Sequence, residues 1–199
     1  MPLGSRISAL CLIGGYYDVE RVSDFLVNAK RADPYGRMLM VRSYFSEVEV
    51  ENDAFHRHLE RCIHNNAKQD EGWNLRSLLD ETDAEQERLW QLLSDCGQRQ
   101  RFLQKVIHAF GDDWSGYRVN LNFTDSKTPV FLLHGRGDRV IPPGESRRLS
   151  SQMSEQGIPN YLCITRFLSH GDSAIRLSQL PELYRLLRGF AWFISCTRR

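Results

Sequence analysis

The sequence has little net charge, no unbroken apolar run of membrane-spanning length and no closely paired cysteines. Its 26 Lys and Arg residues nearly balance its 25 Asp and Glu residues, which leaves a formal net charge of +1. This balance gives no reason to expect nucleic acid or an anionic membrane as a partner. The most apolar segment, residues 180–196, is interrupted by Glu182, Arg185 and Arg188, so we do not expect it to span a membrane.

The cysteines follow no pattern typical of a metal site or a disulfide framework. There are five of them, and none is arranged as Cys-x-x-Cys: Cys11, Cys62, Cys96, Cys163 and Cys196. An odd, scattered set favours a reducing compartment, so we predict a cytoplasmic protein. Residues 1–5 read Met-Pro-Leu-Gly-Ser, which is typical of the remnant of an expression vector, and we expect native sequence from Arg6 onward.

Two polar turns, each placed after an apolar run, are the main positive signal. Residues 130–133 are apolar and lead through His134-Gly135 to Asp138, and residues 160–164 lead to His170 in a Ser-His-Gly turn. The intervening segment, residues 143–156, is amphipathic. The pattern predicts strand, Asp turn, helix, strand, His turn and helix. Ligands and catalytic groups collect at the carboxyl ends of parallel strands, which is where both turns would lie.

A third strand is expected at residues 7–13, and a long helical block follows it. The block, residues 18–125, has a 3.6-residue period, few glycines and dense charge, with helices expected at 19–32, 34–48, 52–66, 74–80, 83–96 and 98–110. Asp18 is expected to cap the first helix, and Asp33 and Asn52 stand before two others. Thr82-x-x-Glu85 reads as a capping box, and Gly97 and Gly111 occupy positions suited to helix C-termini.

The paired turns resemble the C-terminal part of an α/β-hydrolase. His134, Gly135, Asp138, Ile141 and Pro142 match an HGxxDxxVP-like turn that carries the acid, and His170-Gly171 matches the turn of the histidine base. The resemblance covers residues 128–197 and, more weakly, residues 7–18. It implies an incomplete α/β-hydrolase fold of about three parallel strands, with a core from residues 6–17 and 126–199 and a helical lid from residues 18–125.

The nucleophile of that family is absent from the printed sequence. No Gly-x-Ser-x-Gly elbow occurs in it. Ser115, in Asp-Trp-Ser-Gly-Tyr, has a glycine on one side only, and Ser43 lies in a helical pattern. The resemblance therefore implies a chain that supplies the acid Asp138, the base His170 and the lid of a serine hydrolase acting on an ester, thioester or amide, and that is inactive alone.

Each candidate residue also has a structural interpretation. Asp138 could simply form a turn, and His170 could be an exposed loop histidine. We expect His134 to pack or form hydrogen bonds beneath the Asp turn, and Asp172 to cap the last helix. The cluster His56, His58, Cys62 and His64 contains one pair with zinc-ligand spacing. We nevertheless expect no metal there, because the other two histidines do not share that helix face.

An alternative function is a non-catalytic binding or interaction module derived from a hydrolase. Three parallel strands leave an exposed sheet edge, and such an edge favours self-association or pairing with a partner chain. Under the serine-hydrolase hypothesis, by contrast, the ligand is a small acyl substrate, which is acted on when the missing nucleophile is supplied. Neither hypothesis calls for a cofactor.

Overall fold

The chain forms two compact units, and each is described here by itself. A computed structural model describes residues 7–50, 52–66, 74–119, 128–168 and 179–198. The first unit comprises Met1–Val19 and Tyr117–Arg199, and it contains the sheet. The second comprises Glu20–Gly116 and is helical. The chain is thus of mixed α/β class, with seven α-helices and a parallel sheet in its described part.

The sheet has three parallel strands in the order β1-β2-β3. Strand β1 spans Leu10–Ile13, β2 spans Val130–Gly135 and β3 spans Asn160–Thr165. Leu10 pairs with Val130, and Val130 with Asn160, so the strands start level at one end. The three strands and their parallel pairing, predicted from the apolar runs, are confirmed. The central strand β2 is buried throughout, whereas both ends of β1 are exposed.

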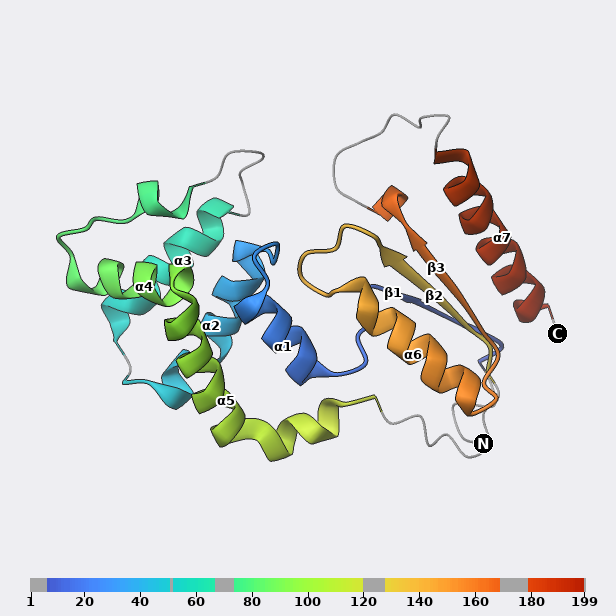
Figure 1. The fold of residues 1–199 in the computed structure, drawn as a ribbon, viewed down its shortest axis with the longest axis horizontal. Coiled ribbons are helices and arrows are strands. Elements are labelled where there is room, and N and C mark those ends of the chain that lie inside the picture. Colours follow the sequence, from blue (N-terminus) through green and yellow to red (C-terminus); the bar gives the residue numbers. More distant parts are fainter. Residues whose placement is uncertain (1–6, 51, 67–73, 120–127, 169–178, 199) are drawn as a thin grey trace. The chain divides into compact units, whose positions relative to one another are not determined.

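Two helices cover opposite faces of this sheet (Figure 1). Helix α6 (Pro143–Glu155) packs Leu149 and Met153 against Val130 and Leu132 of β2. Helix α7 (Leu180–Thr197) lies over the other face and packs against a cluster built on the alternate side chains: Phe131, Leu133 and Cys163. The alternation follows from the two-residue period of a strand, which sends neighbouring side chains to opposite faces.

Helix α7 approaches the sheet closely because it has a glycine at the contact. A Cβ added to Gly189 would lie 2.6 Å from Cε2 and 2.7 Å from Cζ of Phe131. The Phe131 ring is fully buried and has the ring of Phe190 at 5.3 Å, centroid to centroid. Any side chain at position 189 would therefore push α7 away from the sheet.

The helical unit contains most of α1 (Val19–Asn28), all of α2 (Pro34–Val48), α3 (Asp53–Asn66) and α4 (Ala84–Ser94), and all but the last residue of α5 (Cys96–Tyr117). A short 3₁₀ turn, η2, spans Leu75–Leu78. Phe45 of α2 stacks on Phe55 of α3 with ring centroids 4.0 Å apart, and the Arg88 guanidinium lies over both rings. This aromatic stack is the centre of the helical core.

The observed helix starts agree with those predicted from the sequence at two positions and differ at a third. Helix α2 starts at Pro34 as predicted, and the Asp33 carboxylate before it accepts from the amide of Tyr35. The Asn52 side chain accepts from the amides of Ala54 and Phe55, so the predicted Asn52 cap is confirmed. The predicted capping box at Thr82 is wrong. Asp83 is the cap of α4, and its Oδ1 accepts from the amides of Glu85 and Gln86.

The two predicted glycine C-caps are also wrong. Gly97 lies in the first turn of α5, and Gly111 lies within α5, which continues to Tyr117. Arginine side chains instead bind the carbonyl groups at helix ends, which have no partner within their own helix. Arg37 donates to the carbonyls of Leu26 and Ala29 at 2.7 Å each, and Arg99 donates to that of Val27 at 2.8 Å.

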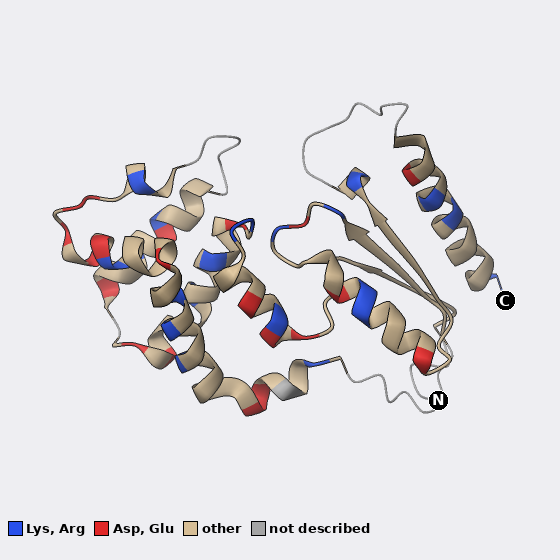
Figure 2. Cartoon of the chain, viewed as in Figure 1, with Lys and Arg blue, Asp and Glu red and all other residues tan. Residues whose placement is uncertain are grey.

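Within the described ranges, no helix combines the length and the apolar character needed to cross a lipid bilayer. Charges of both signs are distributed along the helices, and the three strands carry none (Figure 2).

Candidate functional site

The carboxyl ends of the three strands form the edge at which the sequence predicts a site. Strand β1 is followed by Gly14, whose φ of +64° suits a glycine because L side chains rarely adopt that conformation. The amide of Gly14 donates to the Leu133 carbonyl of β2 at 2.9 Å. Strand β3 leads directly into a 3₁₀ turn, η3, at Arg166–Leu168. The turns after all three strands therefore begin at one edge.

Asp138 lies in the turn after the central strand, and the backbone of that turn orients its carboxylate. Oδ1 accepts from the amides of Val140 at 2.8 Å and Ile141 at 2.9 Å. Oδ2 lies 3.6 Å from Nε2 of His134 and accepts no closer hydrogen bond from the described part of the chain. The turn therefore fixes one oxygen, and the side chain as a whole is 28% exposed.

His134 lies beneath this turn and is fully buried, as expected. Its Nε2 is 3.0 Å from the carbonyl oxygen of Ile141, and since a carbonyl can only accept, that nitrogen carries a hydrogen. Its Nδ1 is 2.6 Å from Oγ of Ser146, and this oxygen also lies 3.1 Å from the carbonyl oxygen of Gly15. His134 thus links the Asp turn to α6 and to the turn after β1.

Glu145 joins the same two elements from the other side. It is 2% exposed, and Oε2 accepts from the amides of Tyr17 at 3.3 Å and Asp18 at 3.1 Å. The carboxylate of Asp18 is also buried and pairs with the Arg118 guanidinium at 2.7 Å. These contacts satisfy buried backbone donors that would otherwise destabilise the edge. They hold the turn after β1 against α6.

Glu182, in the first turn of α7, ties the ends of β2 and β3 together. Its Oε1 is 2.9 Å from Nη2 of Arg136, and its Oε2 accepts from the amide of Arg166 at 3.0 Å. Both arginines directly follow a strand. Glu182 therefore fixes the start of α7 beside the edge that carries Asp138.

The two histidine-turn residues, His170 and Asp172, lie outside the described residues. The possible nucleophiles lie elsewhere: Ser43 in α2, and Ser115 in α5, both in the helical unit and neither on a strand-to-helix turn. Burial raises the pKa of the Cys11 thiol in β1, as it does for Cys62 and Cys163. A raised pKa reduces the thiolate form that a cysteine nucleophile requires.

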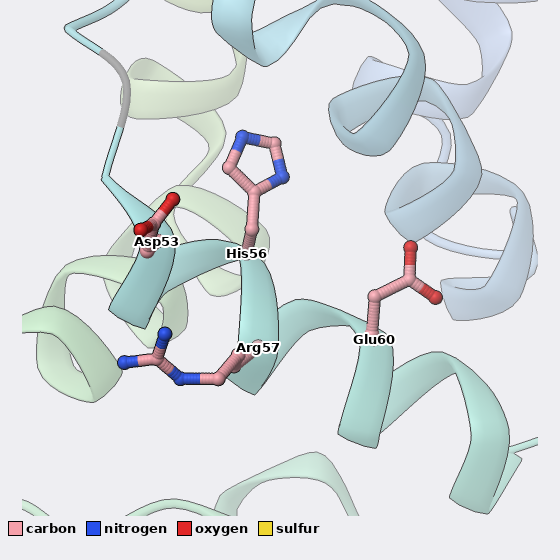
Figure 3. A pocket seen from close by; sticks show the side chains of 4 residues that line it. All are labelled: Asp53, His56, Arg57 and Glu60. Atoms are coloured by element: carbon pink, nitrogen blue, oxygen red, sulfur yellow. The ribbon is translucent and has the colours of Figure 1, made fainter.

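Among the hollows of the helical unit is one of about 630 Å³, whose lining residues are not arranged for catalysis or metal binding. Its four lining residues all come from α3 and spread along that helix (Figure 3): Asp53, His56, Arg57 and Glu60. Glu60 is already paired with Arg42. His58 lies 3.7 Å from Asp83, and Cys62 is buried. No group of three or more potential metal ligands is found among the residues that the structure describes.

Comparison with known proteins identifies no relative: no protein family, curated protein or solved structure matches the chain. The site therefore has to be interpreted from its own geometry. Sequence reasoning singled out Asp138 and the role of His134, but it missed Glu145, Ser146 and Glu182. Their partners lie far away in the sequence, 127 residues in the case of Glu145 and Asp18, so no local pattern marks them.

Proposed function

We propose that this chain supplies the acid, the base and the helical lid of a serine hydrolase, as an incomplete α/β-hydrolase whose nucleophile is not in the printed sequence. Asp138 is the acid and His170 is the base. The substrate class is a carbonyl compound with an acyl group: an ester, thioester or amide. The proposed lid is the helical segment of residues 18–125, which contains the compact helical unit Glu20–Gly116.

The orientation of the Asp138 carboxylate carries the proposal. An acid that orients a histidine needs a fixed carboxylate with one oxygen available to accept the Nδ1 hydrogen. Here Oδ1 is held by the amides of Val140 and Ile141, whereas Oδ2 has His134 Nε2 at 3.6 Å as its nearest partner in the described part of the chain, and the side chain is 28% exposed at the carboxyl end of the central strand. His170 follows the neighbouring strand β3 by five residues, and the turns after adjacent parallel strands lie at the same edge.

The proposed pair has a defined role and a defined limit. Asp138 fixes the tautomer of His170 and stabilises its imidazolium, and His170 takes a proton from the nucleophile and returns it to the leaving group. Neither residue can form the acyl-enzyme, which requires a positioned hydroxyl or thiol. The oxyanion hole of this family also depends on the amide that follows the nucleophile. The chain alone should therefore be inactive.

Hydrolysis of p-nitrophenyl acetate and p-nitrophenyl butyrate tests this limit. The wild-type chain should hydrolyse both at the rate of its Asp138→Asn and His170→Ala variants. Asn is a matched replacement, because its side-chain oxygen can still accept from the amides of Val140 and Ile141. A wild-type rate well above that of His170→Ala would mean that a nucleophile in this chain is at work. Loss of that rate in Ser115→Ala would identify it.

A non-catalytic interaction module is the second candidate, and exposed apolar surface favours it. The side chain of Ile13, at the end of the edge strand β1, is 65% exposed, as is that of Tyr184 in α7. Exposed apolar surface is typical of binding sites where it gathers into a patch. Under this hypothesis the chain binds a partner through β1 or α7, and Asp138→Asn changes neither binding nor fold.

A further inference from the structure

Helix α7 is apolar on more sides than the sheet covers. Five of its large apolar side chains are at least 39% exposed and form what we call the α7 stripe: Leu180, Tyr184, Leu187, Phe190 and Ile194. At about 100° per residue, Gly189 marks the side facing the sheet, and the stripe occupies the arc from about 100° to 220° away from it. A helix that is apolar over most of its circumference is typical of a buried helix.

The charged residues of α7 leave this arc clear. Arg185 and Arg188 lie on the flank beyond β3, where the ring of Trp192 packs near that of Tyr161. Phe190 lies on the opposite flank and packs against Phe131 of β2, the strand next to β1. Figure 2 shows that the charges of α7 before its C-terminus lie in its first half. The stripe thus begins on the side of α7 that faces β1.

Strand β1 presents a second apolar surface beside this flank. Cys11 and Ile13 pair with Phe131 and Leu133, so they face the same side of the sheet as α7. Helix α7 packs on β2 and β3, and Ile13 remains 65% exposed. The sheet face over β1 and the flank of α7 therefore form a step. Packed helices lie about 8–10 Å apart, so one further apolar helix fits this step beside α7.

We propose that a second copy of this chain occupies the step, with the two α7 helices side by side in one layer between the two sheets. Each α7 then covers β1 of the other copy. The side of the stripe that faces β1 contacts the partner's α7. The side that points away from the chain's own sheet contacts the partner's sheet. The arrangement is closed and self-complementary, as expected of a two-fold dimer. It deepens the second candidate function, the binding of a partner through β1 or α7, and does not depend on the proposed hydrolase function.

The area and charge of this surface fit a second copy. Taking about 150–250 Å² for a large apolar side chain, the stripe and Ile13 expose on the order of 600 Å² per copy. Two copies would bury on the order of 1,200 Å², which reaches the lower end of specific interfaces. None of these six residues is charged, so the same surface can meet itself without repulsion. Pairing of β1 edges alone would leave the stripe exposed.

Analytical ultracentrifugation of the full chain tests the dimer, using Leu187→Glu against the matched control Ser195→Glu. Leu187 is 59% exposed at the centre of the stripe, whereas Ser195 is exposed on the polar flank of the same helix. We expect wild type and Ser195→Glu to be dimers at micromolar concentration, and Leu187→Glu to be a monomer with an unchanged circular-dichroism spectrum. The Kd should rise at least 30-fold.

Three results would overturn the proposal. The first is a wild-type chain that stays monomeric from micromolar concentration up to a concentration 100-fold higher. The second is a Leu187→Glu protein that associates as strongly as wild type, which would point to the β1 edge instead. The third is open-ended association in place of a closed dimer. A Leu187→Glu chain that unfolds is replaced by Leu187→Gln, for which the same loss of the dimer is expected.

Discussion

Replacing Gly189 with Ala should destabilise the sheet unit by displacing α7. The new methyl carbon would lie 2.6 Å and 2.7 Å from two ring carbons of Phe131 and 3.1 Å from Cε1 of Tyr161. The Phe131 ring is fully buried beneath α7, so it has little room to move. Overpacking costs about 1–3 kcal/mol, and two contacts under 3.0 Å against a buried ring place this substitution in the upper half of that range, at about 2–3 kcal/mol. Replacing a helical glycine with Ala returns about 1 kcal/mol. The expected net loss of unfolding free energy is about 1–2 kcal/mol.

The unfolding of the sheet unit alone can be followed by the alkylation of Cys163 at increasing urea concentrations. Cys163 belongs to the same packed cluster and is 2% exposed, so it reacts only when the unit opens. Mass spectrometry of its peptide would show a lower urea midpoint for Gly189→Ala. Gly144→Ala is the control, because its added Cβ meets nothing within 4 Å in α6, and its midpoint should stay equal or rise. Equal or greater stability of Gly189→Ala would refute direct packing of α7 on Phe131.

Three further results are expected. Glu145→Ala should destabilise the sheet unit by about 2–3 kcal/mol in the same assay, because it leaves buried amides unpaired, and Glu145→Gln should cost less. Cys96, which is exposed, should react with iodoacetamide at pH 8 much faster than Cys62, whose burial raises its thiol pKa; equal rates would contradict the helical core. The amide and side chain of Gln86 hold the pKa of Asp83 below its usual 3.8. The stability that this cap provides is present above that pH and is lost as pH falls through the lower folded pKa. In thermal unfolding, Asp83→Asn should therefore lose less stability than wild type when the pH is lowered below 4.

The sheet could be predicted because its signals are local. Residues 130–133 are apolar and end in Gly and Asp turn residues, and β2 is buried as such a run predicts. The start of α2 at Pro34 and the cap at Asn52 depend on a few neighbouring residues, and these also could be predicted.

Predictions failed where tertiary contacts determine the structure, or where two neighbouring residues are equally suited to the same role. Thr82 and Asp83 can both cap a helix, and the local pattern does not distinguish them. Gly111 is tolerated inside α5 at a cost of about 1 kcal/mol, which a packed helix can absorb. Gly189 gives no sign in the sequence of its contact with Phe131, and the His134–Ser146–Gly15 connection joins residues up to 131 positions apart.

The placement of His170 relative to Asp138 tests the central claim most directly. A crystal structure that locates both side chains would measure the distance from His170 Nδ1 to Asp138 Oδ2. We predict about 2.6–3.2 Å, or somewhat longer without a bound substrate, with Asp138 Oδ1 still accepting from the amides of Val140 and Ile141. An imidazole on the opposite face of the sheet, or one directed away from Asp138, would contradict the acid–base pair and favour the interaction module.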